Sequence, residues 1–257
     1  MKFNTNKLEG VKVSPIFENE NYDSKLLEYT KSKELFIGKF NEIYVNLPYN
    51  GEKEILIGLG KRNELEENQV REVFFKLVKV LAKHKEFEAQ ITLPKLENIP
   101  TQSIVNAAVE RALHATYKFD RYKSDRKDFP EITINLATEE KIDNIEDIVN
   151  EAFDIINGIF FARDLVNERA EYLYPETLAN IANEELSALG VEVEVYDEKQ
   201  CEELGLKGLL AVGRASDRKP RFIVMKYLNN PDEGEVVGLV GKGVTYDTGG
   251  YSIKQTA

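Results

Sequence analysis

The most unusual chemistry of this chain lies near its last residue, in the stretch GKGVTYDTGGYSIK (241–254). Asp247 stands between Lys242 and Lys254, and the Thr-Gly-Gly turn after it tolerates positive φ. Such a turn can present a carboxylate into a crevice, where it can bind a divalent metal. A lysine amine is normally protonated, with a pKa of about 10.4, but a nearby dication favours its neutral, metal-binding form.

The residues alone leave a second interpretation of this stretch open. A carboxylate beside two lysines is also typical of plain ion pairing on a solvated surface loop. A phosphate-binding loop fits poorly, because its pattern fails twice. Val236 replaces the first glycine of that pattern, and Gly243 replaces the Ser or Thr that binds magnesium.

The composition limits the classes of protein to which the chain can belong. It has 257 residues, of which 42% are hydrophobic, enough for one large domain or two ordinary ones. The net charge of -11 argues against a nucleic-acid-binding surface. No apolar run reaches the roughly 20 residues that span a bilayer, and a lone Cys201 forms no internal disulfide. We expect a cytoplasmic protein whose partners include neither membrane nor nucleic acid.

The elements that must position the final stretch alternate between strand and helix patterns, which predicts an α/β fold. An apolar stripe predicts one helix, and Thr101 is expected to cap a second helix that runs to about Lys118. In this second helix, Ile104, Ala108, Leu113 and Tyr117 are candidates for burial. The first half should contain strands at 10–17, 42–48, 54–60, 87–94 and 131–137. The apolar stripe that predicts the first helix comprises Val70, Val73, Phe74, Leu77, Val78 and Leu81.

The second half begins with a long helical stripe in 138–168, which we interpret as a rigid connector after a domain boundary near residue 140. Pro175 should open a helix that stops at Gly190. Further strands are expected at 191–197, 208–213, 221–228 and 235–241. The last is apolar on both faces, as in a central strand, and stretch 241–254 leaves its carboxyl end, where open α/β sheets bind ligands.

Several stretches resemble the leucyl (cytosol) aminopeptidases, a two-metal family. The final stretch is similar to the family pattern G-K-G-V-T-F-D-S/T-G-G-x-x-x-K, with Tyr246 replacing the usual Phe. Weaker similarities cover the first 140 residues, and the Pro that usually follows the Asn of ARDLVN is absent here. The further matches are ARDLVNE (162–168), YPETLA (174–179), LKGLLAVGRAS (206–216), PRFIVMKY (220–227), ILIGLGK (55–61) and ALHATYKFDRYK (112–123).

The resemblance implies a role for each matched residue. Lys242 would bind one metal through its neutral amine, and Asp247 would bridge both metals. Lys254 would be catalytic, stabilising the substrate carbonyl and the gem-diolate formed from it. The implied cofactors are two divalent ions, which can be zinc, manganese or magnesium. The implied reaction releases N-terminal residues such as leucine from peptide substrates, in a homo-oligomer that the family builds as a hexamer.

The same resemblance implies an N-terminal macro-like α/β domain at 1–140, followed at 141–257 by the connecting helix and the first part of a metallopeptidase domain. Further family ligands are absent from the 257 residues, so we expect a chain cut within its active site and inactive alone. One alternative is a non-catalytic subunit that binds partners or assembles with intact copies. Another is a ligand-binding role for 1–140.

Two minor features of the first domain also permit more than one interpretation. His84 and His114 lie late in predicted helices, where a positive charge interacts favourably with the helix dipole. A metal-ligand role for the two histidines is the alternative. The charged run RYKSDRKDFP (121–130) is expected to be a solvated loop, with an interface role as the alternative.

Overall fold

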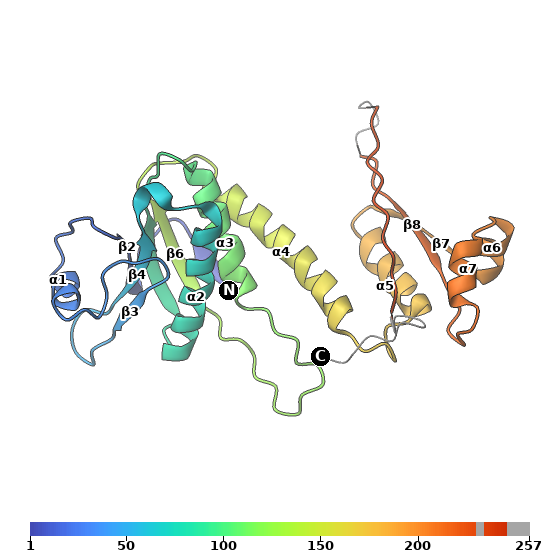
Figure 1. The fold of residues 1–257 in the computed structure, drawn as a ribbon, viewed down its shortest axis with the longest axis horizontal. Coiled ribbons are helices and arrows are strands. Elements are labelled where there is room, and N and C mark those ends of the chain that lie inside the picture. Colours follow the sequence, from blue (N-terminus) through green and yellow to red (C-terminus); the bar gives the residue numbers. More distant parts are fainter. Residues whose placement is uncertain (230–233, 246–257) are drawn as a thin grey trace. The chain divides into compact units, whose positions relative to one another are not determined.

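The computed structural model describes residues 1–229 and 234–245 and divides the chain into two compact units, 1–163 and 164–257. The first unit contains a six-stranded sheet (Figure 1). Its elements are β1 (Lys2–Asn4), β2 (Val11–Phe17), α1 (Lys25–Ser32), β3 (Ile43–Asn46), β4 (Glu54–Gly60), the 3-10 helix η1 (Arg62–Glu64), α2 (Glu67–His84), β5 (Glu88–Leu93), α3 (Thr101–His114), β6 (Thr133–Thr138) and α4 (Ile145–Asn167), which continues into the second unit.

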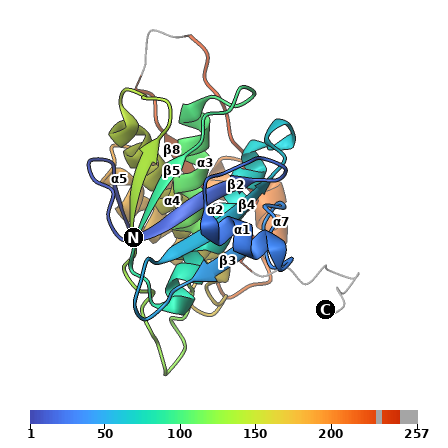
Figure 2. The ribbon, with the colours of Figure 1, turned by 90° about the vertical axis from the view of Figure 1, so that its left-hand side faces the viewer.

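The strand order of the first sheet is β1-β6-β5-β2-β4-β3, and only the β3–β4 pair is antiparallel. Helix α1 lies on one face of the sheet, and α2 and α3 lie on the other (Figures 1 and 2). Strand β4 is almost entirely apolar because both of its faces are covered. The predicted α/β class and all five predicted strands of this half are therefore confirmed.

Helix α2 buries the six residues of the predicted stripe, so that prediction is confirmed. The helix begins with a reciprocal pair of bonds in which Glu66 N–H donates to the side chain of Gln69 at 2.8 Å. It ends at Lys85, whose φ of 59° is left-handed. The helix thus packs one apolar face on the sheet between two well-formed ends.

Helix α3 begins at Thr101 as predicted, but the predicted capping role of Thr101 and the predicted end of the helix need correction. Thr101 does not cap the helix; its hydroxyl donates a 2.6 Å hydrogen bond to the Glu140 carboxylate. Thr101 is already the first residue of the helix and Pro100 occupies the capping position, which is the one that directs a side chain to the first-turn N–H groups. The helix ends at His114 rather than near Lys118, and Tyr117 is half-buried beyond that end.

The connector helix α4 belongs largely to the first unit. Val149, Ala152 and Ile156 are buried in the main core, and Phe153 packs edge-on against Phe3 of β1. This burial extends the first compact unit past residue 140, where we expected the domain boundary. Along the described residues, no helix combines the length and apolarity needed to cross a membrane.

The second unit differs from the predicted order of elements at 208–213 and at 235–241. Residues 208–213, predicted as a strand, form part of a helix. A short apolar run that contains glycine has no periodicity to distinguish the two structures. The elements are α5 (Pro175–Ser187), β7 (Glu192–Tyr196), α6 (Glu198–Glu203), α7 (Lys207–Gly213) and β8 (Phe222–Lys226), and β7 pairs antiparallel with β8.

Candidate functional site

The start of α5 is fixed by local bonds. Pro175 occupies the first turn, where its missing N–H costs nothing. The backbone N–H of Tyr174 donates to the hydroxyl of Thr177 at 2.8 Å. This arrangement holds the stretch 174–179 in place, one of those that carry the family resemblance.

The loop between α7 and β8 contacts the start of α5. The Arg218 guanidinium lies 4.0 Å from the ring centroid of Tyr174, and Arg221 approaches Glu176 at 3.6 Å. Gly213 ends α7 so close to Pro220 that an added Cβ would lie 2.8 Å from the proline ring. Three of the stretches that resemble the family, 174–179, 206–216 and 220–227, are therefore packed together.

A charged cluster lies on the β7–β8 hairpin. Lys226 donates to Glu192 at 3.0 Å and also to Glu194, which accepts a further bond from the Tyr196 hydroxyl. The Lys226 and Tyr196 donors lower the pKa of Glu194 to about 2. Every charge in this cluster has a partner, so the cluster stabilises the strand pair rather than offering free metal ligands.

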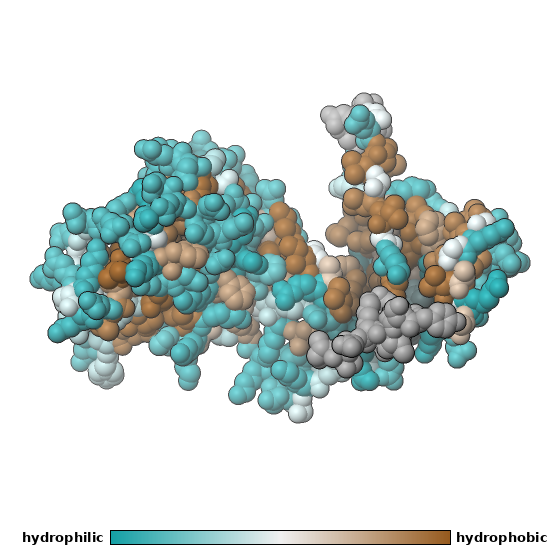
Figure 3. Space-filling view, viewed as in Figure 1, coloured by the Kyte–Doolittle hydropathy of each residue, from teal (hydrophilic) through white to brown (hydrophobic). Residues whose placement is uncertain are grey.

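The segment 234–245, which leads into the candidate site, has no helix or strand. The predicted central strand at 235–241 is therefore wrong for this structure. A central strand needs hydrogen-bonding neighbours, and the described part of the second unit holds only the two-stranded sheet. Its apolar side chains are uncovered (Figure 3), and Val236, Val237, Leu239 and Val240 are 75% to 103% exposed.

Of the three predicted site residues, Lys242 alone lies among the described residues. It is exposed, and its carbonyl accepts a 3.0 Å bond from the N–H of Val244. The adjacent Gly243 faces α5, since a Cβ there would lie 3.6 Å from Leu178. Asp247 and Lys254 lie outside the described residues, so the geometry of the predicted metal site stays a prediction.

The donor chemistry of these residues fits part of a metal site. A carboxylate oxygen and a neutral amine both bind Zn²⁺ and Mn²⁺, but two ions need more donors than these. Within 1–229 and 234–245, no group of three or more His, Cys, Asp or Glu side chains could hold a metal ion. His84 and His114 therefore belong to no such group in the part described.

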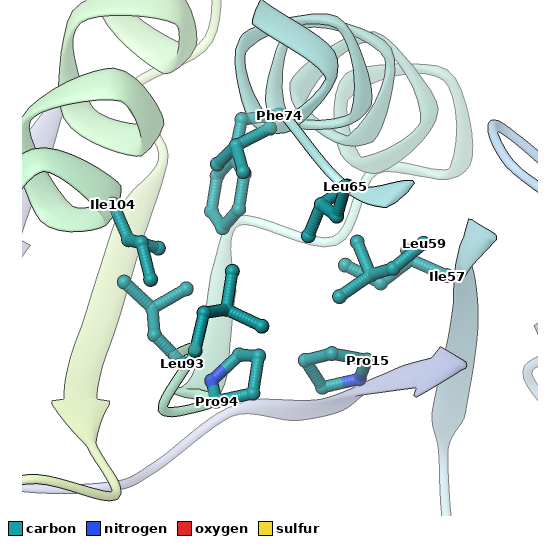
Figure 4. A pocket seen from close by; sticks show the side chains of 10 residues that line it. Pro15, Ile57, Leu59, Leu65, Phe74, Leu93, Pro94 and Ile104 are labelled. Carbon is teal, nitrogen blue, oxygen red and sulfur yellow. The ribbon is translucent and has the colours of Figure 1, made fainter. Parts of the chain in front are cut away.

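A small cavity lies in the first unit, beside strands β2, β4 and β5 (Figure 4). Its volume is about 10 Å³, and its lining is apolar, including Pro15, Phe74 and Pro94. A space of this size holds at most one water molecule, and apolar cavities stay dry. This cavity gives no support to a ligand-binding role for residues 1–140.

Two family models match the chain. The "Cytosol aminopeptidase family, N-terminal domain" matches residues 8–126, and the "Cytosol aminopeptidase family, catalytic domain" matches residues 160–257. The chain belongs to the cytosol aminopeptidase family. One similar protein is the "Probable cytosol aminopeptidase" of Treponema denticola, which is 45% identical to this chain over 255 residues. The alignment covers 99% of this chain and 53% of that relative. Another from Clostridium tetani is 38% identical and covers all of this chain and 54% of the relative.

The chain thus spans about half the length of the curated cytosol aminopeptidases that it matches. Solved structures share its fold. A mutant of tomato leucine aminopeptidase aligns with a TM-score of 0.73 at 17% identity, over 87% of this chain and 50% of that one. The bottromycin maturation enzyme BotP in complex with Mn aligns with a TM-score of 0.70 at 22% identity, over 85% and 45%. The predicted family and α/β fold class are confirmed.

Proposed function

We propose that this chain contributes the first part of the active site of a metal-dependent aminopeptidase. The reaction is the release of N-terminal residues, with a preference for leucine-like side chains, from peptides. The observation that carries the proposal is the stretch 241–254, in which Lys242, Asp247 and Lys254 keep the family spacing within a chain of that family. Because the chain spans about half of its relatives, the activity belongs to a protein that includes the remaining donors.

Lys242 and Asp247 would hold the metals. Lys242 would bind one ion through its neutral amine, and the Asp247 carboxylate would bridge two. Divalent ions such as Zn²⁺, Mn²⁺ or Mg²⁺, when bound, lower the pKa of a water so that hydroxide forms near neutral pH. BotP was solved with Mn, which favours Mn²⁺ as the first ion to test.

Lys254 would act on the substrate rather than on the metals. Its ammonium group would face the carbonyl oxygen of the first peptide bond, where negative charge develops as the nucleophile attacks. One preorganised donor of this kind accounts for roughly 10²–10³ in kcat. A free α-amine on the substrate would fix the register, so that only the first peptide bond is cleaved.

The proposal extends to the location and the assembly of the enzyme. A single cysteine and the naming of relatives as cytosol aminopeptidases favour a cytoplasmic location. We extend the proposal to a homo-oligomer, a hexamer by resemblance to the family, acting on peptide substrates.

The test uses the complete reading frame that contains these 257 residues. After metal removal by a chelator, hydrolysis of leucyl-glycine should return with Mn²⁺ or Zn²⁺, and N-acetyl-leucyl-glycine should stay intact. Asp247→Asn and Lys254→Gln should each lower kcat at least about 10²-fold. Glu235→Gln, in the same segment, is the matched control and should leave kcat unchanged. Equal cleavage of the acetylated peptide, or full activity in Asp247→Asn, would overturn the proposal.

A further inference from the structure

The residues at the end of α3 form a compact cluster with the late turns of α4. The Nη1 of Arg163 lies 3.3 Å from the Nδ1 of His114. Its guanidinium also stacks 3.7 Å from the ring centroid of Tyr117. The ring of Phe160 packs edge-on against His114 at 5.9 Å and tilted against Tyr117 at 5.0 Å. All four side chains are half-buried, and all belong to the first compact unit.

The contact between His114 and Arg163 defines the protonation state of the histidine. A guanidinium has five N–H donors and no acceptor. The bond therefore exists only if Nδ1 of His114 carries a lone pair, which places the ring proton on Nε2. Addition of a second proton, on Nδ1, would replace the bond with two donors and two positive charges that face each other at 3.3 Å.

The surroundings of His114 favour its neutral form. Burial lowers the pKa of the imidazole, and the positive charges of Arg111 on α3 and Arg163 on α4 lower it further. Glu110 acts in the opposite direction, but its carboxylate is already paired with Arg71 of α2 at 3.3 Å. A positive charge on a histidine is expected to be favourable at a helix C-terminus. At His114, burial and the charges of the two arginines outweigh that effect.

We propose that His114 and Arg163 form a pH-sensitive clamp, which holds α4 against the end of α3 while His114 is neutral and releases it when His114 is protonated. The direction of the pH dependence follows from the lowered pKa of His114. The contribution of the clamp is complete above the ordinary histidine pKa of about 6.5. It is lost as the pH falls through the lower value of the folded protein. The stacking of Arg163 on Tyr117 does not titrate in this range, so release is partial and confined to the last turns of α4.

The two histidines of the chain permit a direct titration. His84 is exposed at the end of α2, so His84→Gln leaves one imidazole in a folded protein. Long-range ¹H–¹⁵N correlation spectra of this variant should show the proton on Nε2 and a pKa below 6.5. Adding Arg163→Gln should raise that pKa. A proton on Nδ1 at neutral pH, or a pKa at or above 6.5, would overturn the proposal.

Amide hydrogen exchange tests the release itself. After correction for intrinsic rates, amides at 157–163 should lose protection by about tenfold between pH 7.5 and 5.5. His114→Asn keeps a neutral oxygen acceptor near the position of Nδ1, so its α4 amides should keep the same protection at both pH values. If His114→Asn shows the same loss as the parent chain, the clamp is not the cause and the proposal fails.

Discussion

A Cβ atom placed on Gly58 would lie 2.0 Å from the carbonyl oxygen of Lys39, closer than any real side chain approaches. The loop before β3 crosses strand β4 at this point with its backbone in direct contact. Two backbone bonds fix the crossing, because Gly58 N–H donates to Glu42 at 2.8 Å and Gly60 N–H donates to Gly38 at 3.0 Å. The sheet and this loop therefore fit together only if residue 58 has no side chain.

Gly58→Ala should destabilise the protein by about 3 kcal/mol, because either the loop or β4 must move. Urea unfolding followed by circular dichroism measures the loss. Gly158→Ala is the control, since Gly158 lies within α4 and a Cβ there meets nothing within 4 Å. That change should stabilise the helix by about 0.5–1 kcal/mol. Equal stability of Gly58→Ala and the parent chain would contradict the contact.

The same loop is organised around one carboxylate. Glu42 Oε2 accepts the backbone N–H groups of Ile37, Gly38 and Lys39 at 3.0, 3.1 and 3.0 Å. Glu42→Ala leaves three donors without this acceptor and should cost about 1.5–3 kcal/mol in urea unfolding. Glu42→Gln keeps one carbonyl oxygen and should cost less. Glu52→Ala removes an exposed carboxylate from the next loop, and a loss as large as that of Glu42→Ala would refute this role.

The sequence predicted the elements that have a clear period or sufficient length. Helix α2 has a six-residue stripe over eighteen residues, and β4 is an apolar run bounded by glycine. The prediction failed at 208–213, where six apolar and glycine residues fit a strand as well as a helix. It failed again at 235–241, because a strand needs a pairing neighbour, which a local pattern does not reveal.

The candidate site was predictable only through its motif. Lys242 is exposed within irregular backbone, and no local pattern would distinguish it from an ordinary surface lysine. The clamp of His114 and Arg163 was not predicted, because its members are 49 residues apart. The available signal was the spacing of three between Phe160 and Arg163, which places both side chains on one face of α4. Tyr117 lies beyond the end of α3, so helical spacing does not relate it to His114.

Glu20 and Arg62 form an ion pair whose effect should depend on pH. Arg62 donates from Nε and Nη2 to Glu20 at 2.8 and 3.1 Å, and these bonds lower the pKa of the Glu20 carboxyl below 4.5. The stabilisation is therefore present above pH 4.5 and is lost as the pH falls through the lower folded pKa. Both side chains are about one-third exposed, so Glu20→Gln should cost only about 0.5–1 kcal/mol at pH 7.

Urea unfolding between pH 5 and pH 3 measures this dependence. Stability of the parent chain should fall more steeply in this range than that of Glu20→Gln. Glu64→Gln, which breaks the exposed pair with Lys61, should follow the parent curve closely. Parallel curves for the parent and Glu20→Gln would exclude the proposed linkage.

Tyr22 should titrate later than an ordinary tyrosine. Its hydroxyl accepts the N–H of Phe17 at 2.8 Å and donates to Glu20 at 3.1 Å. Burial, supported by the neighbouring Glu20 charge, raises the pKa of Tyr22 to about 12. The contribution of the neutral phenol is therefore complete below pH 10 and lost as the pH rises toward 12. The difference in 295 nm absorbance between the parent chain and Tyr22→Phe should titrate near pH 12, and a midpoint near 10 would contradict this environment.

The 257-residue chain by itself should bind divalent metals weakly. In the proposed site, Lys242 and Asp247 would supply one amine and one carboxylate, whereas a closed zinc shell needs four donors and a magnesium or manganese shell about six. The described residues add no cluster of three acidic, histidine or cysteine ligands.

Isothermal titration of the purified chain with Mn²⁺ and Zn²⁺ at pH 7.5 tests this argument, together with hydrolysis of leucine amide. We expect no two-site binding in the micromolar range and no hydrolysis above the chelator-treated control. Asp247→Asn should remove any residual binding, because it replaces the one carboxylate that could bridge two ions. If the chain instead binds two ions tightly and hydrolyses leucine amide, its own 257 residues must complete the site. The missing ligands would then have to be sought among the other carboxylates of the second unit.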